Sequence, residues 1–61
     1  MGETALLVAA GAGNNEVVRL FLERHADVNA ADNRQHTALY YAGERGSTEI
    51  IEMLLTAGAE E

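Results

Sequence analysis

The sequence predicts an all-α fold in which two helix-turn-helix units are joined by one extended segment. The first observation behind this prediction is that the chain matches itself after a shift of 33 residues, from Thr4 to Thr37 and from Gly13 to Gly46. The second is that apolar residues recur at three- and four-residue spacing within each copy, which is typical of helices. The third is that residues 26–35 are polar, lack this spacing and separate the copies.

The internal repeat preserves the positions that a shared fold requires, because the matches fall on apolar, small and helix-capping residues. The identical pairs are Thr4 and Thr37, Ala5 and Ala38, Leu6 and Leu39, Ala9 and Ala42, Gly13 and Gly46, Glu16 and Glu49, Leu22 and Leu55, and Ala26 and Ala59.

The first unit contains signals for two short helices. The hydroxyl of Thr4 is expected to cap a helix over residues 5–12, and Gly13, which tolerates a positive φ, is expected to end it. Asn14 is the expected N-cap of a second helix that runs to about Arg24.

The second unit repeats these signals. Thr37 is expected to cap a helix over residues 38–45, Gly46 to end it, Ser47 to cap the next helix and Gly58 to end that one. Because only two residues separate the helices of each unit, they must pack antiparallel. An alanine is matched in both first helices, and its small side chain allows a close contact.

The segment between the units predicts an extended arm, a turn and a returning arm. Ala26, Val28 and Ala30 alternate with more polar neighbours, which indicates an extended backbone. Asp32 and Asn33 are turn-forming residues, so the chain is expected to reverse there and return toward Thr37.

Composition excludes several classes of partner and site. The 61 residues carry a net charge of -6, which disfavours binding to nucleic acid and to anionic membrane surfaces. The longest apolar run is too short to cross a bilayer, and the N-terminus lacks the pattern of a signal peptide. There is no cysteine, so nothing argues for an oxidising compartment, and we expect an intracellular protein.

The candidate chemical motifs fail on their spacing. Gly11 and Gly13 lie in a glycine-rich turn without the lysine and the preceding strand of a phosphate loop. The acidic residues near Asp32 lack the glycine and the final glutamate of a calcium loop. His25 and His36 have no helical spacing and no cysteine nearby. We therefore expect no catalytic site, no cofactor and no metal.

Each copy follows one pattern: Thr-Ala-Leu-x-x-Ala, then Gly, then Glu with two hydrophobic residues, then Leu, and finally, in the first copy, Ala-Asp-Val-Asn-Ala. This pattern resembles the ankyrin repeat over essentially the whole chain. The resemblance implies a short solenoid in which a β-hairpin-like finger projects between stacked helix-turn-helix repeats. It assigns repeat 1 to about residues 2–31, the finger to about 26–36 and repeat 2 to about 32–61, within one unit over 1–61. Ankyrin repeats have no catalytic activity of their own and bind proteins through the fingertips and the concave face of the first helices.

The sequence departs from the family pattern at backbone and bracing positions. His25 and Gln35 stand where glycine is usual, and each would cost about 1 kcal/mol or more if its φ is positive. Leu7 and Tyr40 replace a histidine, so the hydrogen bond between threonine and histidine that braces neighbouring repeats is absent in both copies.

The resemblance predicts a non-enzymatic protein-protein interaction module with a protein partner. Of the adjacent Tyr40 and Tyr41, one is expected to pack inward and the other outward, and the sequence leaves open which. In the first copy, Glu3, Gly11 and Ala12 occupy matching places and offer less to contact. The expected protein-binding residues are Ala31, Asn33, Arg34 and His36 in the finger, and Tyr40, Tyr41, Glu44 and Arg45 on the helix.

Two alternatives stay open. A solenoid normally needs about three repeats to bury its core, so two repeats indicate a fragment, a minimal unit or an engineered one. Such a chain would be a scaffold whose role is folding or self-assembly, forming a homo-oligomer through uncapped repeat ends. A hydrolase, suggested only by the histidine and glutamate content, is the weakest of the three hypotheses.

Overall fold

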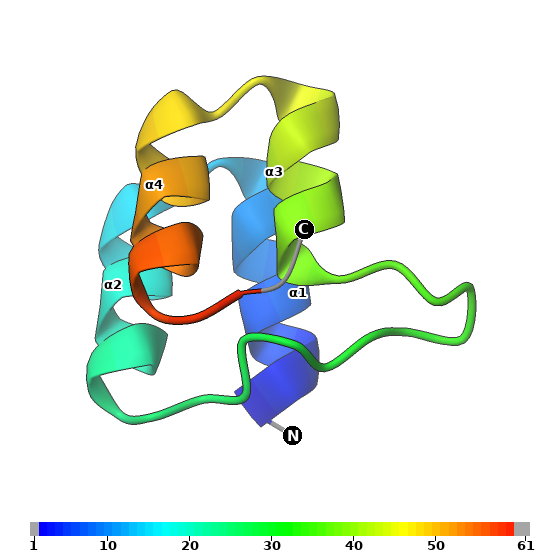
Figure 1. Ribbon diagram of the computed structural model, residues 1–61, viewed down its shortest axis with the longest axis horizontal. Helices are drawn as coiled ribbons and strands as arrows, with labels where there is room; N and C mark the ends of the chain where they lie inside the picture. Colours follow the sequence, from blue (N-terminus) through cyan, green and yellow to red (C-terminus); the bar gives the residue numbers. More distant parts are fainter. Residues whose placement is uncertain (1, 60–61) are drawn as a thin grey trace.

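A computed structural model describes residues 2–59 and confirms the all-α fold (Figure 1). In chain order the helices are α1 (Gly2–Ala12), α2 (Asn15–Glu23), α3 (Ala38–Arg45) and α4 (Thr48–Thr56). None of these helices is long and apolar enough to cross a membrane.

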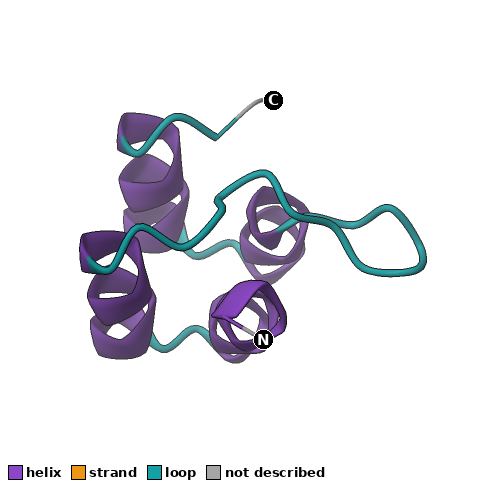
Figure 2. Ribbon diagram, turned by 90° about the horizontal axis from the view of Figure 1, so that it is seen from below, coloured by secondary structure: helices purple, strands orange, loops and turns teal. Residues whose placement is uncertain are grey.

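The four helices form two layers of two, as the stacking of two helix-turn-helix repeats requires. α1 packs against α3 and α2 packs against α4, while the helices of each repeat also pack on one another. Figure 2 shows α2 and α4 on one side, α1 and α3 on the other, and the loop between the repeats projecting away from the α1 and α3 side.

Both repeats end their first helix with the same glycine geometry. Gly13 has φ +73° and Gly46 has φ +77°. The following residue then donates its backbone N–H to an alanine carbonyl five residues earlier, from Asn14 to Ala9 and from Ser47 to Ala42, each at 3.0 Å. The predicted helix-turn-helix joints are therefore confirmed in both repeats.

The predicted N-caps are confirmed at Asn14 and Thr37. Asn14 accepts a hydrogen bond from the backbone N–H of Val17 at 3.2 Å, and Thr37 accepts one from Tyr40 at 3.3 Å. Ser47 occupies the N-cap position of α4, but its hydroxyl makes no capping hydrogen bond.

The prediction that Thr4 caps the first helix is wrong, because α1 already begins at Gly2 and Thr4 lies inside it. The difference from Thr37 has a structural reason. An antiparallel β-bridge to Ala31 holds Thr37 in an extended conformation at φ -93° and ψ 174°. No bridge to Thr4 is formed by the described residues 2–59, so its backbone continues the helix.

The core is small and consists of side chains that all four helices contribute. The matched alanines of the two first helices are both buried, which confirms their predicted role in close helix packing. The buried hydrophobic residues are Leu6, Leu7, Ala9, Ala10, Val18, Ala38, Ala42, Ile50 and Leu54.

Within residues 2–59, two residues other than glycine adopt a left-handed backbone, and both stand where the repeat pattern usually has glycine. His25 has φ 64° and Gln35 has φ 67°. Gly58, the residue equivalent to His25 in the second repeat, has φ 102°. The same hydrogen bonds close both turns, because Ala26 donates to the Phe21 carbonyl at 3.0 Å and Ala59 donates to the Leu54 carbonyl at 2.9 Å.

Replacing either residue by glycine is expected to stabilise the chain. An L-residue in the left-handed region costs about 1–2 kcal/mol, and glycine recovers this at an entropic cost of about 0.5–1 kcal/mol. His25→Gly and Gln35→Gly should therefore each raise the free energy of unfolding by up to about 1 kcal/mol, measured by urea denaturation. Gly58→Ala is the matched control and should lower it; a gain from that variant would contradict the argument.

Candidate functional site

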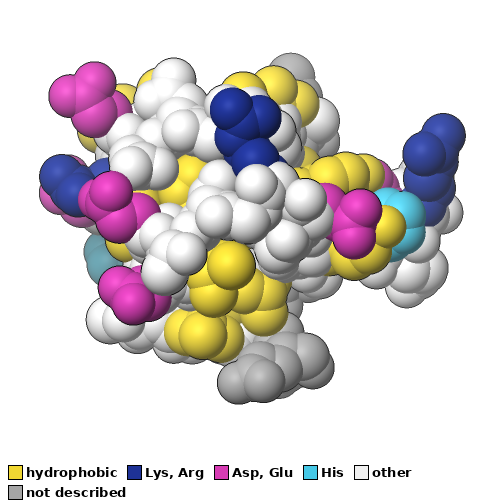
Figure 3. Space-filling model, turned by 90° about the horizontal axis from the view of Figure 1, so that it is seen from above, with side chains coloured by type: hydrophobic (Ala, Val, Ile, Leu, Met, Phe, Trp, Pro, Cys, Tyr) yellow, Lys and Arg dark blue, Asp and Glu magenta, His cyan; other side chains and the backbone are white. Residues whose placement is uncertain are grey.

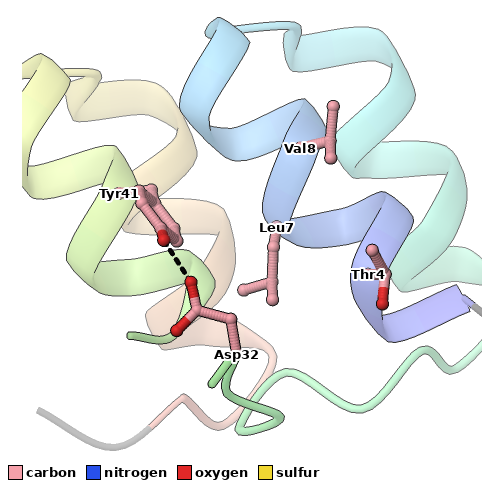
Figure 4. Close-up of a pocket in the computed structure, with 5 residues that line it drawn as sticks. All are labelled: Thr4, Leu7, Val8, Asp32 and Tyr41. Atoms are coloured by element: carbon pink, nitrogen blue, oxygen red, sulfur yellow. Dashed lines mark hydrogen bonds between the residues drawn. The ribbon is translucent and has the colours of Figure 1, made fainter. Parts of the chain in front are cut away.

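A groove of about 310 Å³ opens between α1 and the projecting loop. Its lining comes from three segments that are distant in sequence: Thr4, Leu7 and Val8 on α1, Asp32 in the loop, and Tyr41 on α3 (Figure 4). Most of the lining is apolar, and Val8 leaves 66% of its surface exposed. An exposed apolar side chain beside a groove is available for contact with another molecule.

The loop, residues 26–36, corresponds to the predicted finger, and a tight backbone turn closes it. Asp32 donates its N–H to the His36 carbonyl at 3.0 Å, and Gln35 donates to the Asp32 carbonyl at 2.9 Å. The isolated bridge between Ala31 and Thr37 continues this pairing by one step. Residues 2–59 contain no strand, so the returning arms form a turn with one bridge, which is less regular than a β-hairpin.

The carboxylate of Asp32 organises this turn and ties it to α3. One oxygen, Oδ1, accepts hydrogen bonds from the backbone N–H groups of Arg34 at 2.9 Å and His36 at 3.0 Å. The other oxygen, Oδ2, accepts a hydrogen bond from the hydroxyl of Tyr41. Since Tyr41 belongs to α3, this contact joins the position of the finger to that of the helix.

This hydrogen bond also shifts the pKa values of Asp32 and Tyr41 in opposite directions. The Tyr41 hydroxyl, helped by the His36 amide, holds the pKa of Asp32 below its usual range, and the same hydrogen bond raises the pKa of Tyr41. The stabilisation from Asp32 is present above its unfolded pKa of about 3.9 and is lost as pH falls through the lower folded value. The stabilisation from Tyr41 is present below its unfolded pKa of about 10 and is lost as pH rises through the higher folded value.

Three aromatic rings meet at the base of the finger. The His36 ring stacks on the Tyr40 ring with centroids 3.9 Å apart and an angle of 16° between the planes. Tyr41 meets His36 and Tyr40 edge-on, at 5.6 and 5.4 Å. The structure decides between the two tyrosines: Tyr41 is half-buried at the groove, and Tyr40 is 42% exposed. Among the described residues, none forms a hydrogen bond with the buried Nδ1 atom of His36.

Arg45 bridges the two repeats at the opposite end of α3. Its Nη1 atom lies 3.5 Å from the Gly11 carbonyl, at the C-terminal end of α1, where the helix dipole favours a cation. Its side chain also covers Gly13, since a Cβ added there would come within 2.2 Å of the Arg45 Nε.

The predicted site residues are thus spread over three places. Ala31, Asn33 and Arg34 are exposed in the finger, while Glu44 and Arg45 are exposed at the end of α3. His36, Tyr40 and Tyr41 come together at the base of the finger. Four groove residues are not among the site residues predicted from the sequence: Thr4, Leu7, Val8 and Asp32. The 33-residue repeat carried a signal for two of them, because Leu7 is the equivalent of Tyr40 and Val8 is the equivalent of Tyr41.

Charge is distributed unevenly around these features. Figure 3 shows acidic side chains gathered on the side of α2 and α4, and a basic side chain on the projecting finger. The exposed acids of those helices are Glu16, Glu23, Glu49 and Glu52. Among residues 2–59, no group of three or more His, Cys, Asp and Glu side chains is placed to hold a metal ion.

Comparison with known proteins places the chain among repeat proteins. A family model described as "Ankyrin repeats (3 copies)" matches residues 1–61. Protein fem-1 homolog A-like from Mus musculus is 40% identical over 58 residues, which cover 95% of this chain and 9% of that protein. BCL-6 corepressor-like protein 1 from Mus musculus is 48% identical over 59 residues, which cover 95% of this chain and 3% of that protein. Ankyrin repeat and SAM domain-containing protein 6 from Rattus norvegicus is 42% identical over 60 residues, which cover 97% of this chain and 7% of that protein. The chain therefore spans less than a tenth of the length of each of these relatives.

Proposed function

The chain belongs to the ankyrin repeat family, and from this premise we propose that it binds a protein partner through the finger and the adjoining face of α1 and α3. Ankyrin repeats generally act as non-enzymatic modules for protein-protein interaction, and we propose no catalytic role for this chain. The proposed contact residues are Ala31, Asn33, Arg34, His36, Tyr40, Tyr41, Glu44 and Arg45, together with the groove residues Leu7 and Val8.

The observation that carries this proposal is the hydrogen bond between Asp32 and Tyr41 beside an apolar groove. It holds the finger against α3 before any partner arrives, so less conformational entropy is lost on binding. Tyrosine supplies a large contact area with few rotatable bonds and is enriched at binding hot spots. The half-buried Tyr41 therefore supports both the shape of this face and its affinity.

Substitution on this face is expected to weaken binding while the helices stay intact. Peptides selected from a displayed library against the immobilised chain provide a probe. Tyr41→Ala or Arg45→Glu should reduce their affinity by about five- to thirtyfold, as loss of a central interface residue does. Far-UV circular dichroism should remain unchanged.

Glu52→Ala is the matched control, because Glu52 is exposed on α4 in the other layer. Peptide affinity should be unaffected by this variant. If the selected peptides bind the Tyr41 variant as tightly as the native chain and lose affinity with Glu52→Ala, the contact face lies elsewhere.

A second candidate function is a repeat scaffold that forms a homo-oligomer through its end faces. This candidate is favoured by a difference in exposure between equivalent residues of the two repeats. Leu7 and Ala10 are buried, whereas their counterparts Tyr40 and Gly43 are exposed. The second repeat covers this face in the first repeat, whereas the same face of the second repeat is exposed within residues 2–59.

Sedimentation equilibrium at several concentrations, with circular dichroism on the same samples, tests this candidate. End-to-end packing of identical units is heterologous, so it should give a series of growing species. Average mass and helix content should then rise together with concentration. A fully folded monomer at micromolar concentration would eliminate self-assembly.

A further inference from the structure

The groove combines an apolar floor with a carboxylate at one end. Leu7 and Val8 provide the floor, the ring of Tyr41 provides one wall, and Asp32 lies at the finger end (Figure 4). Its volume of about 310 Å³ is at the lower limit of ligand pockets, about 300–1,000 Å³. It therefore suits one long side chain of a partner better than a bulky ligand.

The carboxylate of Asp32 remains available to a cation. The donors that reach it are the backbone amides of Arg34 and His36 and the hydroxyl of Tyr41, and all three are uncharged. They use three of about four acceptor positions on an ionised carboxylate, and none of these three donors carries a charge that would cancel its own. A partner that covered Asp32 with an apolar group would bury this charge without compensation.

The charge of the whole chain favours the same type of partner. The net charge is -6, and the chain contains no lysine. A field of this sign speeds the approach of cationic segments and slows that of acidic ones. The arginine nearest to Asp32 in the sequence is Arg34, whose side chain is exposed at the finger turn.

We propose that the groove receives a lysine or arginine side chain from a basic segment of the partner, an inference that rests on the function proposed above. The methylene stem lies along Leu7 and Val8, as long cationic side chains do on apolar surfaces. The charged head meets the Asp32 carboxylate and the face of the Tyr41 ring, which combines a charge-assisted hydrogen bond with a cation-π contact.

Short peptides that differ at one residue test this assignment. The probes are acetylated and amidated Gly-Ala-Xaa-Ala-Gly, in which Xaa is lysine, arginine, norleucine or glutamate. Norleucine keeps the lysine stem and removes the cation. NMR titration of the isotope-labelled chain should shift the amide signals of Leu7, Val8 and Tyr41 with the lysine and arginine peptides. These should bind about two- to fivefold more tightly than norleucine, the range for a solvent-exposed ion pair.

Asp32→Asn isolates the charge. Its side-chain oxygen can still accept the amides of Arg34 and His36, so the turn is preserved. This variant should bind the lysine peptide no better than the norleucine peptide. Asp27→Asn is the matched control, since Asp27 also accepts a backbone amide in the finger, from Asn29 at 3.0 Å, and does not line the groove. It changes net charge equally and should retain the preference for lysine.

Three outcomes would overturn the assignment: norleucine binding as tightly as lysine, glutamate binding best, or Asp27→Asn abolishing the lysine preference as fully as Asp32→Asn. The library peptides separate this failure from failure of the proposed function. If they contact the groove through acidic or neutral residues, the binding function stands and the basic partner is wrong. If they contact α2 and α4 only, the proposed binding face is wrong as well.

Discussion

Replacing Leu54 by alanine is expected to unfold a measurable fraction of this protein at room temperature. Leu54 lies on α4 with 0% of its surface exposed, within the small shared core. Truncating a buried leucine to alanine costs about 2–5 kcal/mol, because transfer free energy is lost and a cavity remains. A chain of this length is stabilised by only about 3–9 kcal/mol in total. Urea denaturation followed by far-UV circular dichroism measures the loss.

Leu55→Ala is the matched control because it removes the same atoms from the next residue of the same helix. Leu55 is 39% exposed, so its truncation leaves a smaller void and should cost about 1 kcal/mol or less. Equal losses for the two variants would show that the observed division between core and surface on α4 is incorrect.

The opposite change, enlarging a buried side chain, should also be strongly destabilising at Ala42. This alanine is completely buried on α3, and its equivalent in the first repeat, Ala9, is buried as well. A leucine at Ala42 would need space that close helix packing does not offer, at a cost of about 1–3 kcal/mol. The melting temperature should fall by about 4–8 °C for each kcal/mol.

The neighbouring glycine provides the control for Ala42→Leu. A Cβ added to Gly43 would meet no atom within 4 Å. Gly43→Ala should therefore stabilise the helix by about 0.5–1 kcal/mol, since alanine loses less backbone entropy on folding. A leucine at Ala42 that leaves the melting temperature unchanged would contradict close packing in this part of α3.

Local sequence signals predicted the helices closely because their ends depend on nearby residues. α3 was expected over residues 38–45 and spans Ala38–Arg45, between the Thr37 cap and the left-handed Gly46. Capping and left-handed backbone geometry act within one helical turn, so the residue types alone indicate them. The first helix is the exception, because the extended conformation of a capping threonine depends on the bridge that Thr37 forms with Ala31.

The candidate site could be predicted only in part, since its contacts join segments that periodicity does not relate. The residue type of Asp32 predicts a turn, and backbone hydrogen bonds close a turn at this position. Its hydrogen bond to Tyr41, nine residues later, depends on how the finger returns onto α3. The groove in addition needs α1, whose Leu7 and Val8 lie more than twenty residues before Asp32.

The sequence by itself determined the 33-residue repeat, the ends of most helices and the two positions, His25 and Gln35, where glycine is usual and whose backbone is left-handed in the structure. Each of these follows from short-range sterics and hydrogen bonding. Only the tertiary structure decided that Tyr41 faces the groove while Tyr40 is exposed, and that Asp32 joins the finger to the helix. Those features depend on the distance and angle between stacked repeats, which the packing of the whole core sets.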